Sequence, residues 1–168
     1  MSGTGVDTEA FEALMAGVEA PSFVVTTASG GEVAGCLVGF ATRCSIDPPR
    51  FGIWLSKLNR TYRVAEPATM LVVHLLRAGD GDLAVRFGGE TGDEVDKFAG
   101  LEWQPGPDGC PVIDRLDWFA GSVVDRVDTG DHVAFVLAPR GGQCRHSAKQ
   151  LPGAEVEDID PGHPIPGR

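Results

Sequence analysis

Residues 35–62, GCLVGFATRCSIDPPRFGIWLSKLNRTY, set the local structure that the rest of the chain must accommodate. Two apolar, β-prone runs, residues 36–41 and 50–55, flank a Ser-Ile-Asp-Pro-Pro segment. Pro48 has a fixed φ and no N–H group, and Pro49 restricts the residue before it, so the chain must turn between the runs. The pattern predicts a strand, a turn and a second strand.

The second strand leads directly into a polar segment that can bind an anion. Its hydroxyl, amide and cationic groups belong to Ser56, Lys57, Asn59, Arg60 and Thr61. Asparagine is a favoured N-cap, so Asn59 predicts a helix over residues 60–65, whose spare backbone N–H groups and nearby cations can hold a phosphate. The alternative is that Lys57 and Arg60 are solvated charges and that Asn59 only caps the helix.

The segment before residue 35 predicts a helix and a hairpin. Apolar residues recur with helical spacing in residues 9–18, which predicts a helix packed on the rim of a sheet. The β-prone runs at residues 22–28 and 33–42 flank a Ser-Gly-Gly-Glu turn and predict two paired strands. Gly35 and Gly39 in the return strand indicate bulges or the close approach of a ligand.

Downstream, residues 69–76, TMLVVHLL, are almost continuously apolar and predict a central buried strand. His74 within this strand is interpreted as a hydrogen-bonded core residue in preference to a ligand. The other predicted elements are a short helix at residues 82–87, a helical turn at 93–98, one or two strands at 112–127 and a last strand at 132–138. From residue 139 onward the composition predicts a disordered or draped tail.

Six or seven strands joined mostly by short turns predict a mainly β fold, an antiparallel barrel with small peripheral helices. The length of 168 residues fits one domain. We expect that domain at residues 1–138, followed by a tail rich in Gly, Pro and charged residues at 139–168.

Composition excludes several classes of partner. The net charge of −10 argues against nucleic acid and anionic membranes. No apolar run approaches the roughly 20 residues that span a bilayer, and no signal peptide is recognisable at the N-terminus. The four cysteines have no CxxC spacing and the four histidines are scattered, so we expect reduced thiols, no metal site and a cytoplasmic protein.

Motifs of common enzyme classes are absent from the sequence. It contains no GxSxG, Walker or HExxH motif, and no GxGxxG that opens a helix after a strand. Cys44 lies beside Arg43 and can be read as a reactive thiol, but a buried, inert cysteine is the favoured interpretation. The polar segment that follows the double-proline turn remains the best candidate site.

Taken together, short segments in a defined order give the chain a resemblance to the flavin reductase-like, FMN-binding split-barrel family over residues 10–138. The segments are Val24-Val25-Thr26-Thr27 with Gly30 and Gly35, Ser45-Ile46-Asp47-Pro48-Pro49, Ser56-Lys57-Leu58-Asn59-Arg60-Thr61, Leu83-Ala84 with Phe87, Asp96-Lys97-Phe98, and Gly130-Asp131-His132.

The resemblance implies a split-barrel homodimer that binds FMN or FAD in the dimer groove and reduces it with NAD(P)H. It implies that Ser56, Lys57, Asn59 and Thr61 hold the flavin phosphate, and Arg60 of the same polar segment is a further candidate for cofactor binding. It also implies a lining of the isoalloxazine by Gly39, Phe40, Thr42, Cys44 and Ser45. His132 is the candidate catalytic residue, in contact with the nicotinamide or the flavin edge; a purely structural His132 is the alternative. A monooxygenase component is the implied recipient of the reduced flavin.

The sequence departs from the family pattern in two places. Hydroxyl residues that are common in the family are replaced by Leu37, Gly39 and Phe40, and the usual closing strand is not recognisable after Ala138. These departures keep two alternatives open: a flavin-binding carrier without NAD(P)H turnover, and a deazaflavin-dependent split barrel. A dimer that binds no cofactor is a further alternative.

Overall fold

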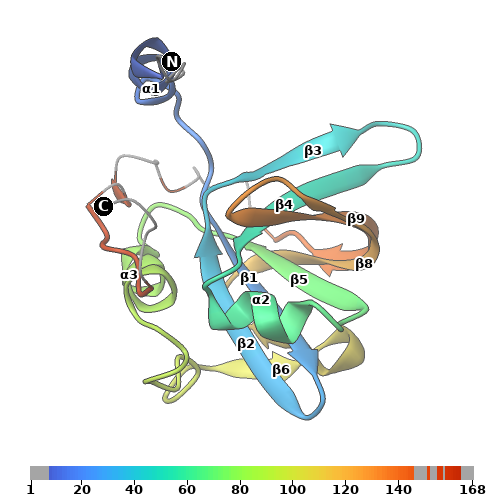
Figure 1. Ribbon diagram of the computed structural model, residues 1–168. Coiled ribbons are helices and arrows are strands. Elements are labelled where there is room, and N and C mark those ends of the chain that lie inside the picture. The colour runs from blue at the N-terminus through green and yellow to red at the C-terminus, as the bar shows by residue number, and fades with distance from the viewer. Residues whose placement is uncertain (1–7, 146–150, 152–154, 157, 164–168) are drawn as a thin grey trace.

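The computed structural model describes residues 8–145, 151, 155–156 and 158–163 and confirms a mainly β, antiparallel fold with few helices (Figure 1). In chain order the elements are α1 (Glu9–Met15), β1 (Phe23–Ser29), β2 (Glu32–Val38), β3 (Ala41–Ser45), β4 (Arg50–Ser56), α2 (Arg60–Ala65), β5 (Met70–Leu75), α3 (Gly81–Gly89), β6 (Trp103–Pro105), the 3₁₀ turn η1 (Pro107–Gly109), β7 (Pro111–Ile113), β8 (Asp117–Asp128) and β9 (His132–Gln143).

Seven of these strands form one sheet in the order β2-β1-β5-β8-β9-β4-β3, in which every pairing is antiparallel. The two edge strands, β2 and β3, are separated in the chain by only Gly39 and Phe40. A link of two residues cannot cross a flat seven-stranded sheet, because adjacent strands lie about 4.8 Å apart. The sheet therefore curls until its edges meet, which gives the split barrel predicted from the sequence.

The prediction of one continuous strand over residues 33–42 is wrong. The chain leaves β2 at Val38, where its pairing partner is β1, and enters β3 at Ala41, where its partner is β4. A change of partner requires a break, and Gly39 provides it. At Gly35 the β1–β2 pairing continues without the predicted bulge, and the close neighbours are aromatic side chains: an added Cβ would lie 2.9 Å from the Phe87 ring.

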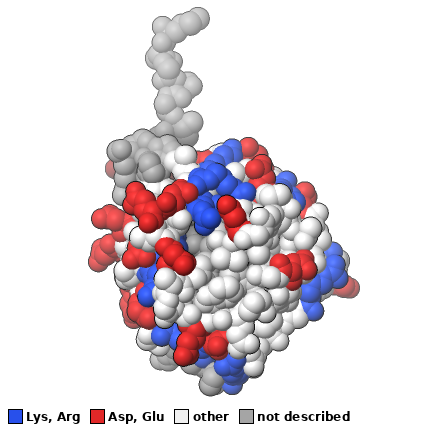
Figure 2. Space-filling view, turned by 90° about the horizontal axis from the view of Figure 1, so that it is seen from below, with Lys and Arg blue, Asp and Glu red and all other residues white. Residues whose placement is uncertain are grey.

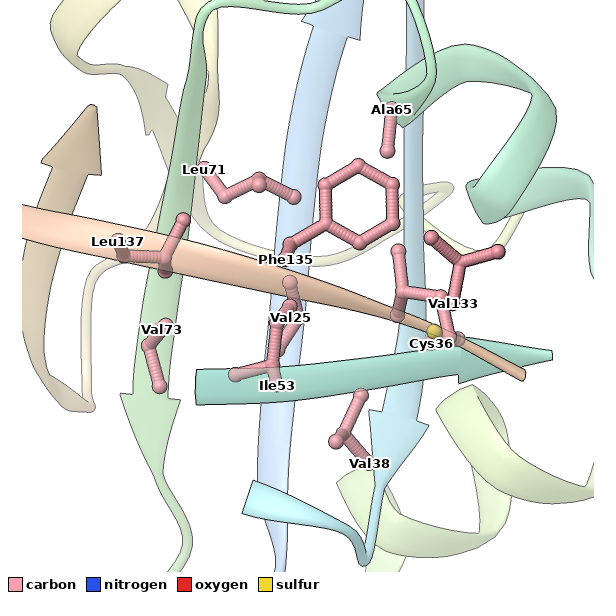
Figure 3. Close-up of a cluster of buried hydrophobic side chains, with 11 residues drawn as sticks. Val25, Cys36, Val38, Ile53, Ala65, Leu71, Val73, Val133, Phe135 and Leu137 are labelled. Carbon is pink, nitrogen blue, oxygen red and sulfur yellow. The ribbon is translucent and has the colours of Figure 1, made fainter. Parts of the chain in front are cut away.

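Side chains from six elements meet in the barrel interior (Figure 3). On β5 and β9 the contributing residues alternate, Leu71 with Val73 and Val133 with Phe135 and Leu137, as expected when one face of each strand points inward. Fully burying side chains of this size contributes about 1.5–3 kcal/mol each, so this cluster is the main source of stability.

A second apolar cluster packs α3 against the outer face of the sheet. It includes Val24 of β1, Leu83 and Phe87 of α3, and Leu151 from the C-terminal region. Because β1 and β5 are covered on both faces, residues 71–74 of β5 are all buried. This confirms the prediction of a central buried strand from the continuous apolar run.

His74 is fully buried and is hydrogen-bonded through both ring nitrogens. Its Nδ1 lies 3.0 Å from the Val24 carbonyl oxygen, and its Nε2 accepts the Ile113 N–H at 3.1 Å. The interpretation as a core histidine is therefore confirmed. Burial lowers the pKa of His74 from 6.5 to about 4, although the hydrogen bond to Val24 opposes the shift.

The last strand is longer than predicted. It was expected to end at Ala138, but β9 continues to Gln143 and pairs with β8 over the added length. Pro139 is tolerated because β4 pairs with β9 only as far as Leu137, and because the β8–β9 register shifts beside it. Of the predicted tail, residues 146–150, 152–154, 157 and 164–168 lie outside the described residues.

The N-terminal helix is shorter than predicted and does not pack on the sheet. α1 ends at Met15, and its apolar side chains are exposed, Phe11 by 58% and Leu14 by 70%. Figure 1 shows it apart from the barrel, at the end of an extended segment. Helical periodicity correctly predicted an apolar face, but the sequence did not indicate what would cover that face.

Charged residues of both signs are interspersed around a broad uncharged surface on the face shown in Figure 2. None of the helices in the described part of the chain is long and apolar enough to cross a bilayer.

The burial of His74 predicts a pH dependence of folding. In the unfolded chain His74 binds a proton with a pKa near 6.5, whereas in the folded state its pKa is about 4. The stability from a neutral His74 is thus complete above pH 6.5 and is lost as the pH falls toward 4, by up to about 3 kcal/mol. Urea unfolding should show this loss in the natural chain, whereas His74→Gln, which cannot titrate, should lack it. Parallel pH profiles for the two proteins would contradict this role of His74.

Candidate functional site

The link between the two sheet edges forms the centre of the candidate site. The carbonyl of Phe40 accepts the N–H of Trp54 at 2.9 Å, which fastens the link to β4. The Phe40 side chain is nevertheless 63% exposed, and its ring centroid lies 5.3 Å from that of His132. An aromatic ring is thus presented at the opening between β2 and β4.

The turn from β4 into α2 lies beside this link and is ordered by its own side chains. The Leu58 N–H donates to Ser56 Oγ at 3.3 Å, and the Thr61 N–H donates to Asn59 Oδ1 at 2.9 Å. Asn59 is therefore the N-cap of α2, as predicted. The Lys57 N–H donates to the Asp131 carbonyl at 3.0 Å, which ties the turn to the start of β9.

Asp131 and His132 lie at the start of β9. His132 is directly opposite Ser56 in the β4–β9 register. Its Nδ1 lies 2.7 Å from the Asp131 carboxylate, so the carboxylate fixes the orientation of the imidazole ring. This hydrogen bond lowers the pKa of Asp131.

The cations of the predicted phosphate site are engaged by carboxylates. Lys57 Nζ lies 2.7 Å from Asp128, and this hydrogen bond lowers the pKa of the carboxyl group. Arg60 lies 3.5 Å from Glu32 and 3.9 Å from Asp93. A phosphate would have to share or replace these partners, which is feasible because the side chains of Asp128 and Glu32 are 68% and 62% exposed.

Two adjoining cavities open between these elements and form one groove. The barrel lobe, of about 150 Å³, lies between β2 and β4 and includes Gly39 and Trp54 in its lining. The α3 lobe, of about 300 Å³, lies between the barrel and α3 and includes Phe87 and Thr91. The residues common to both linings are Leu37, Phe40, Ser56, Asn59, His132 and His163.

The groove therefore unites Gly39, Phe40, Ser56, Asn59 and His132 of the predicted site. Three other predicted residues lie apart from it: Thr42, Cys44 and Ser45 belong to β3, in the hairpin that projects from the barrel in Figure 1. Thr42 and Cys44 are exposed, so the buried state favoured for Cys44 is wrong. β3 is an edge strand, and its three central residues, 42–44, are all exposed.

Arg60 and Thr61 line a separate cavity of about 510 Å³ beside Lys97. Thr61 is 1% exposed. The pKa of the nearby Cys36 thiol is raised by burial. Lys97 Nζ donates to the carbonyls of Phe87 at 2.9 Å and Gly35 at 3.3 Å. Lys97 thus joins the end of α3 to β2, and burial lowers its pKa.

Two segments of the groove were missed by sequence reasoning. One is the end of α3 with the following loop, and the other is the C-terminal region, through Val156, Ile159, Pro161, Gly162 and His163. The sequence of the C-terminal region has no periodicity, and its place is determined by tertiary contacts. The amphipathic pattern of α3 predicts the helix that carries Phe87 and Gly88. It does not predict that this helix packs beside β2.

Residues 15–153 match the model of the flavin reductase like domain family. The chain belongs to this family. The match covers most of the sequence, and it includes both the Gly39–Phe40 link and the turn at Ser56–Thr61.

Three curated relatives illustrate the relationship. A protein of Rhizobium meliloti (strain 1021) named "Probable flavin reductase" is 33% identical over 117 residues, which cover 67% of this chain and 37% of that protein. A protein of Mycobacterium tuberculosis (strain ATCC 25618 / H37Rv), the reductase subunit HsaB of a flavin-dependent monooxygenase, is 29% identical over 140 residues, or 75% of this chain and 73% of that protein. The FMN reductase (NADH) RutF of Klebsiella pneumoniae (strain 342) is 30% identical over 127 residues, which cover 75% of this chain and 77% of that protein.

The chain spans 37% and 50% of the lengths of the two Rhizobium meliloti proteins that it matches. Among solved structures, component B of a nitrilotriacetate monooxygenase from Mycobacterium thermoresistibile has a TM-score of 0.76 and 25% identity, and the match covers 88% of this chain and 82% of that one. A flavin reductase domain protein from Arthrobacter sp. FB24 has a TM-score of 0.79 at 21% identity, and the match covers 94% of this chain and 96% of that one. This likeness supports the fold.

The residues of the groove fit a flavin in chemical terms. Leu37, Phe40 and Trp54 provide an apolar and aromatic surface for a flat ring. Ser56, Asn59 and His132 provide hydrogen-bonding groups on the same cavity, and Lys57 follows Ser56 directly. Ligand sites typically combine such a largely apolar lining with a few placed polar groups.

The Asn59 cap can be tested separately from ligand binding. Asn59→Ala removes the oxygen that accepts the Thr61 N–H, and it should lower the free energy of unfolding by about 1 kcal/mol. Asn59→Asp retains an acceptor and should recover most of the loss. Urea unfolding of the three proteins measures both effects, and equal stability of the Ala variant and the natural chain would exclude the cap as a stabilising element.

Proposed function

We propose that the protein is an NAD(P)H-dependent flavin reductase that transfers a hydride from nicotinamide to FMN, with FAD as a possible substitute. The observation that carries the proposal is the two-lobed groove at the seam of the barrel, in a chain that belongs to the flavin reductase like family. The name of the Klebsiella relative supports FMN as the flavin and NADH as the hydride donor.

We assign the flavin ring to the barrel lobe, against Gly39 and Phe40, and its phosphate to the turn that contains Ser56, Lys57 and Asn59. Arg60 and Thr61 support this end from the neighbouring cavity. Lys57 directly follows Ser56 of the groove lining, and release from exposed Asp128 would free it for a phosphate. Arg60 can be released in the same way from Glu32.

A bound flavin would supply the two-electron chemistry, because its ring accepts a hydride from NADH and a proton from water. The role of the protein is to hold the flavin ring and the nicotinamide ring together in an orientation that allows hydride transfer. His132 is the proposed catalytic residue: in the tautomer whose Nδ1 donates to Asp131, its Nε2 is left as an acceptor for a group at the ring edge.

We further propose that the chain acts as a homodimer in the cytoplasm. Exposed apolar groups support a second copy: Phe11 and Leu14 on α1, Phe40 at the link, and Ile46, which is 79% exposed at the tip of the projecting hairpin. The exposed positions of Thr42 and Cys44, with neighbouring Ser45, would then face the site of the partner. Free cysteines in the described part of the chain and a need for nicotinamide nucleotides support the cytoplasm.

The names of relatives also suggest where the reduced flavin goes. The Mycobacterium tuberculosis relative is a reductase subunit of a flavin-dependent monooxygenase. We propose that this protein likewise supplies reduced flavin to a monooxygenase component.

A flavin carrier without NAD(P)H turnover is the second candidate. It is favoured by the side chains of Leu37, Gly39 and Phe40, which offer no hydroxyl group at the lining of the barrel lobe. Two measurements separate the candidates: FMN binding by calorimetry and NADH oxidation with FMN added. A reductase shows both, a carrier shows binding alone, and a protein that shows neither contradicts both proposals.

The phosphate assignment predicts the effect of removing one cation. Lys57→Met should weaken FMN binding by about ten-fold, because a charge-assisted hydrogen bond contributes about 1.5–3 kcal/mol and part of it is already offset by Asp128. Arg63→Met is the matched control, because Arg63 lies on α2, pairs with Asp93 and, unlike Lys57, does not adjoin in sequence a residue that lines either lobe. Calorimetric titration measures both variants. Equal FMN affinity of Lys57→Met and the natural chain would refute the assignment of Lys57 to the phosphate.

A further inference from the structure

We propose that the C-terminal residues 158–163 form the wall that positions the nicotinamide ring in the α3 lobe of the groove. The inference rests on the function proposed above, and it gives a role to a segment whose sequence does not match the family pattern. Its support is the way in which this segment docks on α3 and the lobe that it lines.

The segment is held on the end of α3 by close backbone contact. The Gly162 N–H donates to the Gly88 carbonyl at 3.1 Å. A Cβ added at Gly162 would lie 2.5 Å from the carbonyl carbon and oxygen of Glu90. No side chain fits at that distance, so glycine is required for the segment to approach the loop after α3 this closely.

Ile159 adds an apolar anchor to this backbone contact. It packs against the cluster that contains Phe87 and Leu151, and its Cγ2 would lie 3.5 Å from a Cβ added at Gly88. Leu151 is 1% exposed, and its N–H donates to the Leu76 carbonyl at 3.0 Å, so the same region of the chain is fixed to the core upstream.

The segment contributes unequally to the two lobes. Ile159, Pro161, Gly162 and His163 all line the α3 lobe, whereas His163 alone of them also lines the barrel lobe. A disturbance of the segment should therefore alter the α3 lobe and leave the proposed flavin contacts of Ser56 and Asn59 in place. The two ligands of the proposed reaction can be tested separately for this reason.

The chemistry of the α3 lobe suits a nicotinamide. Ile159 and Pro161 face it with apolar groups, while Glu90, Asp131 and His163 bring polar groups to the same cavity. A carboxamide carries both donors and an acceptor, so it can pair with carboxylates and with an imidazole. A volume of about 300 Å³ is at the lower end for ligand sites, which fits one ring with its amide and leaves the rest of the dinucleotide outside.

Gly162→Ala tests the proposal in the full chain. The added methyl group must lift the segment from Glu90, so the FMN-loaded variant should bind NAD⁺ at least about ten-fold more weakly by calorimetry, with KM for NADH raised in parallel. Its affinity for FMN should stay within about two-fold of that of the natural chain. Gly81→Ala is the control, because Gly81 is the first residue of α3 and a Cβ added there meets nothing within 4 Å.

Ile159→Ser removes the apolar anchor without adding bulk and should weaken NAD⁺ binding in the same direction. Unchanged NAD⁺ affinity in both variants would overturn the proposal. Tighter NAD⁺ binding would also overturn it, since the segment would then compete with the nicotinamide. An equal loss of FMN and NAD⁺ affinity would refute the separate roles of the lobes. A natural chain that binds no FMN would instead refute the proposed function, and this inference with it.

Discussion

The structure depends on one topological constraint, the two-residue link between the edges of its sheet. β2 and β3 stand at opposite ends of a seven-stranded order, yet only Gly39 and Phe40 separate them. The sheet can satisfy both conditions only by closing on itself. The hydrogen bond from Trp54 N–H to the Phe40 carbonyl secures the closure on the β4 side, and the interior cluster around Phe135 fills the barrel that results.

The same constraint places the candidate site. Closure brings the link beside the turn from β4 into α2 and beside the start of β9, three pieces of chain that are separate in sequence. The link itself forms no regular β-ladder, so Phe40 is free to present its ring at the opening. Polar groups from Ser56, Asn59 and His132 reach the same groove because the β4–β9 register sets Ser56 opposite His132. Catalysis by a bound flavin requires little more of the protein than such positioning.

Local signals in the sequence predicted the elements that local interactions determine. The Asn59 cap, the buried β5 strand and the glycine turn between β1 and β2 each depend on neighbours in the chain, and all three are present. The break after Val38, the extension of β9 past Pro139 and the exposed face of α1 depend on which strand or surface lies alongside. No residue pattern within those segments specifies that partner.

The site was predicted in the same partial way. The β4–α2 turn was identified from its polar groups and the Asn59 cap, and His132 through the family resemblance; the structure gathers Ser56, Asn59 and His132 in one groove. The C-terminal wall could not be predicted, because the contact of Gly162 with Glu90 is a tertiary approach between a glycine and a loop far from it in the chain. The hairpin residues Thr42 and Cys44 are exposed and line neither lobe of the groove, and their place in β3 depends on a pairing with β4 that the local sequence does not reveal.

The central claim is that this groove brings a flavin and a nicotinamide together for hydride transfer. The most direct measurement mixes the FMN-loaded protein with NADH in the absence of oxygen and follows the absorbance of the flavin. The bound flavin should be bleached in a single turnover, at a rate that saturates as the NADH concentration rises. A bound flavin that stays oxidised at saturating NADH would contradict it.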